Sequence, residues 1–257
     1  MDQERFILYL KEMAKKYSVA DISTVRFETG KIILSCNKGE FSFVYHYPLS
    51  ADSVENTVPL LHWRKKRKYV ELKNLLKNRM IETPVAMRIH HVIPKGEFQD
   101  SLRSLLIYEA DLAEWMLGQS VDRIFADFSG DKYTNCILSM DGNIKVSMEL
   151  GFSPNGSEPI LLHEIIARTG IASDMAADTQ TQQYPIYVFK GEKTERYTDI
   201  DNELYDLDNT QADCIRFILD ILADPVQISG LLKQAEHLER IFQAAERAGR
   251  NLEYVEI

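Results

Sequence analysis

Five strand-like runs in the second half of the chain limit most strongly what it can fold into. They read SVDRIFADF, TNCILSM, NIKVSMELGF, ILLHEIIAR and PIYVFK. In the third run, Ile144, Val146 and Met148 alternate with polar or small residues, which predicts a strand with one face in the core and one wetter face. The pair Asp141-Gly142 lies between the second and third runs and is a strong hairpin signal. We therefore expect an antiparallel sheet.

Apolar residues at helical spacing predict helices on either side of this run of strands. The clearest segments are residues 2–16, 68–80, 98–117, 210–223 and 229–248. Gly118 follows the third segment and fits a helix C-cap. A β-rich stretch broken at Gly30 and Gly39 follows the first. The pattern predicts an α+β fold class, with a large, mostly antiparallel sheet and helices on one face, preceded by a short N-terminal helix-and-strand segment.

Composition excludes several classes of protein. The formal charge of −9 argues against general nucleic-acid binding, although residues 64–79, RKKRKYVELKNLLKNR, are locally basic. No run approaches the roughly 18 apolar residues of a membrane span, and the N-terminus lacks the apolar centre of a signal peptide. Cys36, Cys136 and Cys214 lie far apart, which predicts buried, reduced thiols without a disulfide framework. We expect a soluble, cytoplasmic protein.

Neither a metal site nor a serine nucleophile is indicated by the spacing of ligating and nucleophilic residues. His90 and His91 are adjacent, so on a strand they point to opposite faces and cannot both ligate one metal ion. The other histidines are scattered along the chain. Ser153 and Ser157 lie in the sequence FSPNGSEP, which has no nucleophile-elbow pattern.

The helix predicted around LLIYEADLAEWMLG, residues 105–118, carries a carboxylate on its apolar side. At about 100° per residue, Glu109 falls among the leucines, alanines and methionine of one face. A buried carboxylate must be paired, so we expect it to meet a backbone group or an arginine. A second stripe occupies roughly the opposite side and is a candidate wall of a ligand cleft; its members are Ser104, Tyr108, Asp111 and Trp115.

The order of several motifs resembles the glucose-fructose oxidoreductase / inositol dehydrogenase family. LLIYEADLAEWMLGQSVDRIFADF is similar to the family's substrate-domain helix and following strand, whose pattern is Asp-x-x-x-His-x-x-Asp, an apolar stretch and a glycine. RKYVELKNLLKNRMIETPVAM, LLHEIIARTGIASD and IFQAAERAGRNLEYV resemble further pieces in the family's order. The likeness covers roughly residues 58–257. It predicts a substrate-type domain over residues 58–257, with residues 1–57 as a small N-terminal remnant of a Rossmann domain.

The resemblance implies hydride transfer between a nicotinamide cofactor and a sugar, polyol or related carbonyl compound. In the family, a Rossmann domain binds the cofactor, a Glu-Lys-Pro tripeptide supplies a lysine, and the helix histidine transfers a proton. Aligned on that pattern, His46-Tyr47-Pro48 stands where the tripeptide is expected. Only two glycines, nine residues apart, precede it, and no GxGxxG motif follows a strand. We therefore predict no cofactor-binding residues and no cofactor, with NAD or NADP as the alternative.

The family's helix motif is also altered at two of its three positions. Ser104 replaces the first aspartate and Tyr108 the histidine, while Asp111 is kept. A phenol with an ordinary pKa near 10 does not replace a histidine that titrates near neutrality unless its environment shifts it strongly. Tyr108 and Tyr47 are the only candidates for catalysis. The ligand-binding candidates are Ser104, Tyr108, Asp111, Trp115, His46 and Tyr47.

These observations favour a degenerate sugar-dehydrogenase-like protein that is non-catalytic and binds a small carbohydrate-like ligand or a protein partner. One alternative is an NAD(P)-dependent oxidoreductase acting on a sugar or polyol, with tyrosine in place of the usual lysine and histidine. A second alternative is a structural subunit without a ligand. By resemblance, we expect a homodimer formed through the open face of the sheet, over the strands from Asp122 to Phe152.

Overall fold

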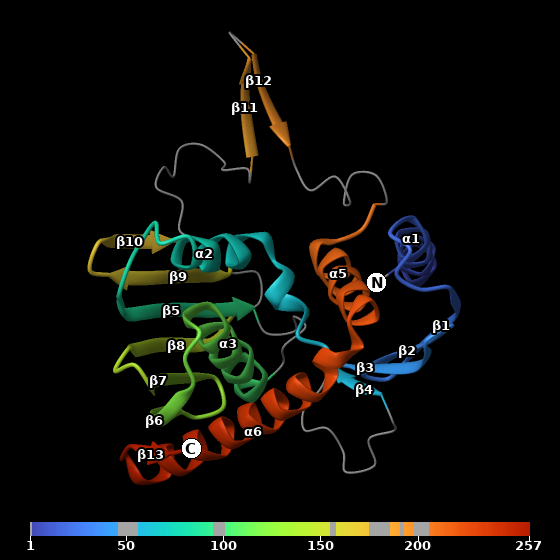
Figure 1. Ribbon diagram of the computed structural model, residues 1–257. Coiled ribbons are helices and arrows are strands. Elements are labelled where there is room, and N and C mark those ends of the chain that lie inside the picture. Colours follow the sequence, from blue (N-terminus) through green and yellow to red (C-terminus); the bar gives the residue numbers. More distant parts are fainter. Residues whose placement is uncertain are drawn as a thin grey trace. The chain divides into compact units, whose positions relative to one another are not determined.

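Figure 1 shows a computed structural model of the chain, which describes residues 2–45, 56–94, 101–154, 158–174, 186–190, 193–197 and 206–257. The chain divides into two compact units. Unit 1 comprises Met1–Lys66 with Ala176–Ala235, and unit 2 comprises Arg67–Met175 with Glu236–Ile257. Among the helices of the described ranges, none combines the length and the apolarity that a membrane crossing requires.

Unit 1 contains a small sheet and the helices α1 (Gln3–Lys16) and α5 (Asn209–Ala223). The sheet has the order β1-β2-β3-β4, with bounds Ile22–Glu28, Lys31–Cys36, Gly39–Val44 and Thr57–Pro59. The first three strands are antiparallel, and β4 pairs parallel to β3. The unit also holds the 3-10 helices η1 (His62–Lys65) and η2 (Pro225–Gln227), and the hairpin of β11 (Ile186–Lys190) and β12 (Lys193–Tyr197).

The predicted boundary at residue 57 differs from the division into compact units. Residues 58–66 group with the N-terminal sheet because β4 pairs with β3. Helix α5 joins the same unit because it packs against α1 and η1. Whether residues 1–57 are a remnant of a Rossmann domain, and residues 58–257 a substrate-type domain, stays a prediction.

Unit 2 is built on the predicted large sheet, and its α+β class is confirmed. The strand order is β10-β9-β5-β8-β7-β6-β13, and every neighbouring pair is antiparallel except β5 and β8. The strand bounds are β5 Pro84–Pro94, β6 Val121–Ser129, β7 Tyr133–Met140, β8 Lys145–Ser153, β9 Ile160–Ala167, β10 Gly170–Ser173 and β13 Val255–Glu256. Side chains alternate between buried and more exposed along β8, as its sequence predicted. The result is one core face and one open face.

Three helices complete this unit: α2 (Arg67–Lys77), α3 (Leu102–Leu117) and the part of α6 (Ile228–Asn251) from residue 236 onward. Helix α3 packs on β5 and β8, and α2 packs on α3 (Figure 1). The α3 helix begins after Ser101, whose hydroxyl accepts the backbone N–H of Ser104, and ends at Gly118. Gly118 has a left-handed φ of 64°, so the predicted C-cap is confirmed.

The hairpin predicted at Asp141-Gly142 is present but uses a longer turn. Strand β7 ends at Met140 and β8 begins at Lys145. Asn143 is the turn residue with a positive φ, at 61°. The three cysteines are free, as expected, but Cys36 is only half-buried because it lies at the end of β2.

Candidate functional site

Helix α3 places a fully buried carboxylate, that of Glu109, against the core face of the large sheet. Strands β5 and β9 lie side by side in this sheet, with Ile89 paired to His163. His91 is two residues beyond Ile89 and therefore points to the same face as His163. The strand register thus brings two histidines, far apart in the sequence, beneath one carboxylate.

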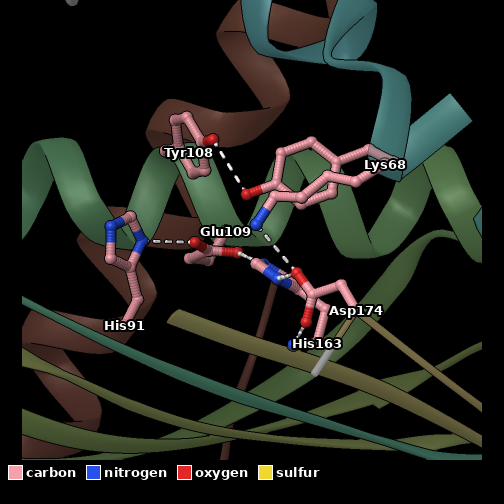
Figure 2. Close-up of polar contacts among 7 residues, drawn as sticks. Lys68, His91, Tyr108, Glu109, His163 and Asp174 are labelled. Carbon is pink, nitrogen blue, oxygen red and sulfur yellow. Dashed lines mark hydrogen bonds and ion pairs between the residues drawn. The ribbon is translucent and has the colours of Figure 1, made fainter. Parts of the chain in front are cut away.

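Each oxygen of Glu109 contacts one of these histidines (Figure 2). His91 Nδ1 lies 2.5 Å from Oε1, and His163 Nε2 lies 2.9 Å from Oε2. The partner expected from the sequence was a backbone group or an arginine, so the need for a partner was predicted correctly and its identity was not. Burial alone would raise the pKa of Glu109, but the charges and hydrogen bonds of His163 and His91 lower it to about 2. The carboxylate is therefore ionised.

His163 lies between two carboxylates. Its Nε2 faces Glu109, and its Nδ1 lies 2.9 Å from Oδ2 of Asp174. A carboxylate only accepts hydrogen bonds, so both ring nitrogens must donate and the imidazole carries both protons. In agreement with this, the pKa of His163 is raised above its ordinary value. Burial alone would lower this pKa, because desolvation disfavours the charged ring, but the two carboxylates outweigh that effect. His163 is a fully buried cation.

Asp174 connects the buried side chains of Glu109 and His163 to a partly exposed residue of unit 2, Lys68. Its Oδ1 accepts the backbone N–H of His163 at 2.6 Å, and its Oδ2 accepts Lys68 Nζ at 2.8 Å. The Lys68 side chain is 38% exposed, whereas that of Asp174 is 2% exposed. His163 and Lys68 hold the pKa of Asp174 below its usual value despite burial. The contacts form an unbroken chain, here called the buried relay: Lys68, Asp174, His163, Glu109 and His91.

Two tyrosines lie against the buried relay. The Tyr108 hydroxyl donates to the Tyr69 hydroxyl at 3.1 Å. The Tyr69 ring is 4.7 Å from the His163 ring, and the Tyr108 ring is 5.5 Å from the His91 ring. Burial raises the pKa of Tyr69 well above its ordinary value of 10, and the nearby carboxylates add to the effect. The two buried tyrosines therefore lie along one side of the relay.

The four ligand-binding candidates on α3 have different surroundings. Tyr108 and Asp111 are buried, with 3% and 0% of their surfaces exposed, and Ser104 and Trp115 are half-buried. Lys73 of α2 lies 4.0 Å from the centre of the Trp115 ring. The second stripe of α3 thus meets α2 at Tyr108 and Trp115. His46 and Tyr47, the remaining candidates, lie outside the described residues, so a role of Tyr47 in catalysis stays a prediction.

The members of the buried relay other than Glu109 were not identified from the sequence. His90 and His91 were considered only as metal ligands, and His163 was regarded as isolated. One available signal was His163 on the alternating strand ILLHEIIAR, at a position facing the core. A histidine on a core face needs partners for its ring nitrogens, and Glu109 needed one too. Within the described ranges, no group of three His, Cys, Asp or Glu side chains is arranged to hold a metal ion.

Together, the large sheet and its covering helices define a dehydrogenase-like fold. No model of a protein family matches the chain, and no curated protein does. Solved structures do match, and several of them are inositol dehydrogenases. Myo-inositol dehydrogenase from Corynebacterium glutamicum aligns with a TM-score of 0.57 at 12% identity, over 79% of this chain and 65% of its own.

Two further matches, both from Lactobacillus casei, contain bound molecules. Scyllo-inositol dehydrogenase with NAD(H) and scyllo-inositol has a TM-score of 0.54 at 15% identity, over 76% of this chain and 63% of its own. Myo-inositol dehydrogenase with NAD(H) and myo-inositol has a TM-score of 0.54 at 14% identity, over 80% and 63%. The chain thus spans less than two thirds of the length of these dehydrogenases. The resemblance predicted from the sequence is confirmed at the level of the fold.

The prediction of no cofactor is contradicted by these matches, because the two Lactobacillus casei dehydrogenases of similar fold contain bound NAD(H). It rested on the missing glycine motif, and a sequence motif is a weaker guide than a shared fold. The usual nucleotide cradle needs a parallel strand, a glycine turn and an open helix N-terminus. In α1 and α5 the carboxylates of Asp2 and Asp208 already accept first-turn N–H groups.

Proposed function

We propose that this chain is a sugar-dehydrogenase-like protein that works by binding a small carbohydrate-like ligand and has lost the proton-transfer step. The observation that carries the proposal is the state of Tyr108, which stands where the resembling family keeps its histidine. Its side chain is buried and its hydroxyl is used by a hydrogen bond to Tyr69. A proton-transfer group must reach the reacting atom, and a buried phenol whose hydroxyl already donates to another tyrosine does not meet this requirement.

The ligand is proposed to be a polyol or sugar, since inositols occupy related structures. Ser104 is the candidate that lies in the first turn of α3 and is partly exposed. A ligand hydroxyl can exchange hydrogen bonds with a serine hydroxyl in either direction.

The test combines a binding measurement with an activity measurement. We expect one or more members of an inositol, polyol and sugar panel to raise the melting temperature, with NAD(H) or NADP(H) present in parallel samples. Ser104→Ala should reduce this shift. Reduction of NAD⁺ or NADP⁺ should stay at background, with an inositol dehydrogenase of Lactobacillus casei as the positive control. If no compound raises the melting temperature, the chain is a structural subunit and the proposal fails.

A second candidate function is that of an active oxidoreductase on a sugar or polyol. The buried relay favours it, because the rings of His163 and His91 lie against Tyr69 and Tyr108. The matched variant Tyr108→Phe removes only the hydroxyl. Turnover by the wild type that Tyr108→Phe abolishes would establish this second function and overturn the first.

We also propose that the chain forms a homodimer through the open face of the large sheet, in the cytoplasm. Phe125, Ile137 and Tyr133 are half-buried on the open face. The face also carries the ion pair of Arg88 with Glu164 at 3.4 Å. A mixture of apolar and paired charged side chains is typical of an interface between subunits.

A further inference from the structure

The outer side of α6 carries a groove lined by arginines. It has a volume of about 470 Å³, which is in the range of small-molecule sites. Arg240, Gln243, Arg247 and Arg250 recur at steps of three and four residues, so they lie along one stripe of the helix. Ile257 and Glu246 complete the lining. Three guanidinium groups against one carboxylate make the groove locally positive in a chain whose formal charge is −9.

One end of this stripe is anchored in the core. Arg240 Nη2 donates to His237 Nδ1 at 3.3 Å, and His237 Nε2 donates to Oε1 of Glu114 at 2.8 Å. Glu114 is 7% exposed and also accepts the backbone N–H of Val121 at 2.7 Å. Gln243 is held as well, since its amide donates to Glu239 at 3.2 Å. These contacts limit the side-chain motion that a ligand would otherwise have to arrest.

The other end of the stripe is available for a ligand. Arg247 and Arg250 are exposed, and within the described residues neither forms an ion pair or a hydrogen bond with a carboxylate. Being three residues apart, they are neighbours on the helix surface. Arginine presents a planar fork of N–H donors that matches phosphate oxygens in pairs. The two together form a clamp for one phosphate group.

We propose that this groove binds a small phosphate-bearing molecule with at least two anionic groups. Arg247 and Arg250 hold one group. Arg240 meets a second, and its place on the helix is about 10 Å from that of Arg247 at a rise of roughly 1.5 Å per residue. The lining of the site shares no residue with the buried relay or with the α3 candidates, and the inference does not depend on the proposed function.

Calorimetric titration of the full chain with phosphate, pyrophosphate and tripolyphosphate tests this inference at low ionic strength. We expect tripolyphosphate to bind about tenfold or more tighter than phosphate, because it carries several anionic groups that can meet more than one of the arginine side chains at once. Arg247→Ala with Arg250→Ala should weaken all three ligands about tenfold or more. Arg240→Ala should weaken tripolyphosphate while leaving phosphate nearly unchanged. Circular dichroism confirms that each variant is folded.

The matched control is Lys77→Ala with Arg168→Ala, which removes the same charge from exposed positions outside the groove. Equal losses in the control and in the arginine pair would mean that binding follows net charge, and the inference would be wrong. Absence of binding by the wild type to any of the three probes would also overturn it.

Discussion

The surroundings of His163 and His237 differ, although both histidines contact a carboxylate of the same helix, α3. His163 donates from both ring nitrogens, to Glu109 and Asp174, and its side chain is fully buried. His237 donates to Glu114 from one nitrogen and accepts from Arg240 at the other, and its side chain is 18% exposed. Because His163 faces two acceptors, its ring must carry both protons and is a cation. His237 faces one acceptor and one donor, so only one of its ring nitrogens carries a proton and the ring is a single neutral tautomer.

The difference shows how the same residue type can serve two purposes. Around His163, two carboxylates are balanced by the imidazolium and the ammonium of Lys68, so the interior holds charges that neutralise one another. Buried ion pairs of this kind contribute little net stability, but losing one member is costly. Around His237, the chain of contacts runs outward and orients an arginine at the surface. The contacts around His163 stabilise the core, whereas those around His237 orient a side chain at the surface.

Removing His163 should give the largest effect. His163→Ala leaves Glu109 with His91 and Asp174 with Lys68 and the backbone N–H of residue 163, inside a protein core that now contains a cavity. We expect a loss of about 3–5 kcal/mol in the free energy of unfolding. Urea denaturation followed by circular dichroism measures it. A loss below about 1 kcal/mol would mean that water reaches this region.

The pH dependence of stability should follow from the same region. The folded pKa of Glu109, about 2, lies below its ordinary 4.5, so its stabilisation is present above pH 4.5 and is lost as the pH falls toward 2. This shift corresponds to roughly 3 kcal/mol. The pKa of His163 is raised, so its contribution is complete below 6.5 and is lost as the pH rises through the folded value. Melting temperatures across this range should therefore decline at both ends, and His163→Ala should flatten the alkaline decline.

Changing the carboxylate of the second region should have the smallest effect. Glu114→Gln keeps an oxygen that can accept from Val121 and His237 and removes only the charge. We expect a loss of about 1 kcal/mol in urea denaturation, because charge-assisted hydrogen bonds exceed neutral ones by about this amount. If Glu114→Gln lowered the free energy of unfolding as much as His163→Ala does, the regions around His163 and His237 would not differ in their contribution to stability.

Local patterns predicted much of this fold. The alternation in β8 and the glycine at the end of α3 are properties of neighbouring residues, so they could be recognised without knowing the rest of the structure. The central position of β5 in the sheet could not be recognised from the local sequence, because the strand precedes α3 and yet lies between β9 and β8. That insertion pairs Ile89 with His163, and it depends on contacts more than 70 residues apart.

The candidate site shows the same limit. The position of Glu109 on its helix predicted burial and a partner, because helix periodicity is local. Its partners come from two strands whose adjacency is tertiary. The sequence places Tyr108 on a second stripe of α3, but which element meets Tyr108 depends on how α2 packs. The arginine groove was not anticipated, since α6 was considered only for its apolar stripe.

The buried relay also has a consequence for the order in which the unit assembles. Its members come from α2, α3, β5, β9 and the end of β10, so it closes only after these segments have met in register. Contacts between residues so distant in the chain carry a large loop-closure cost and tend to form after the folding barrier. Interactions made after the barrier slow unfolding and hardly change the folding rate. The relay is therefore placed to prolong the lifetime of the folded unit once it has formed.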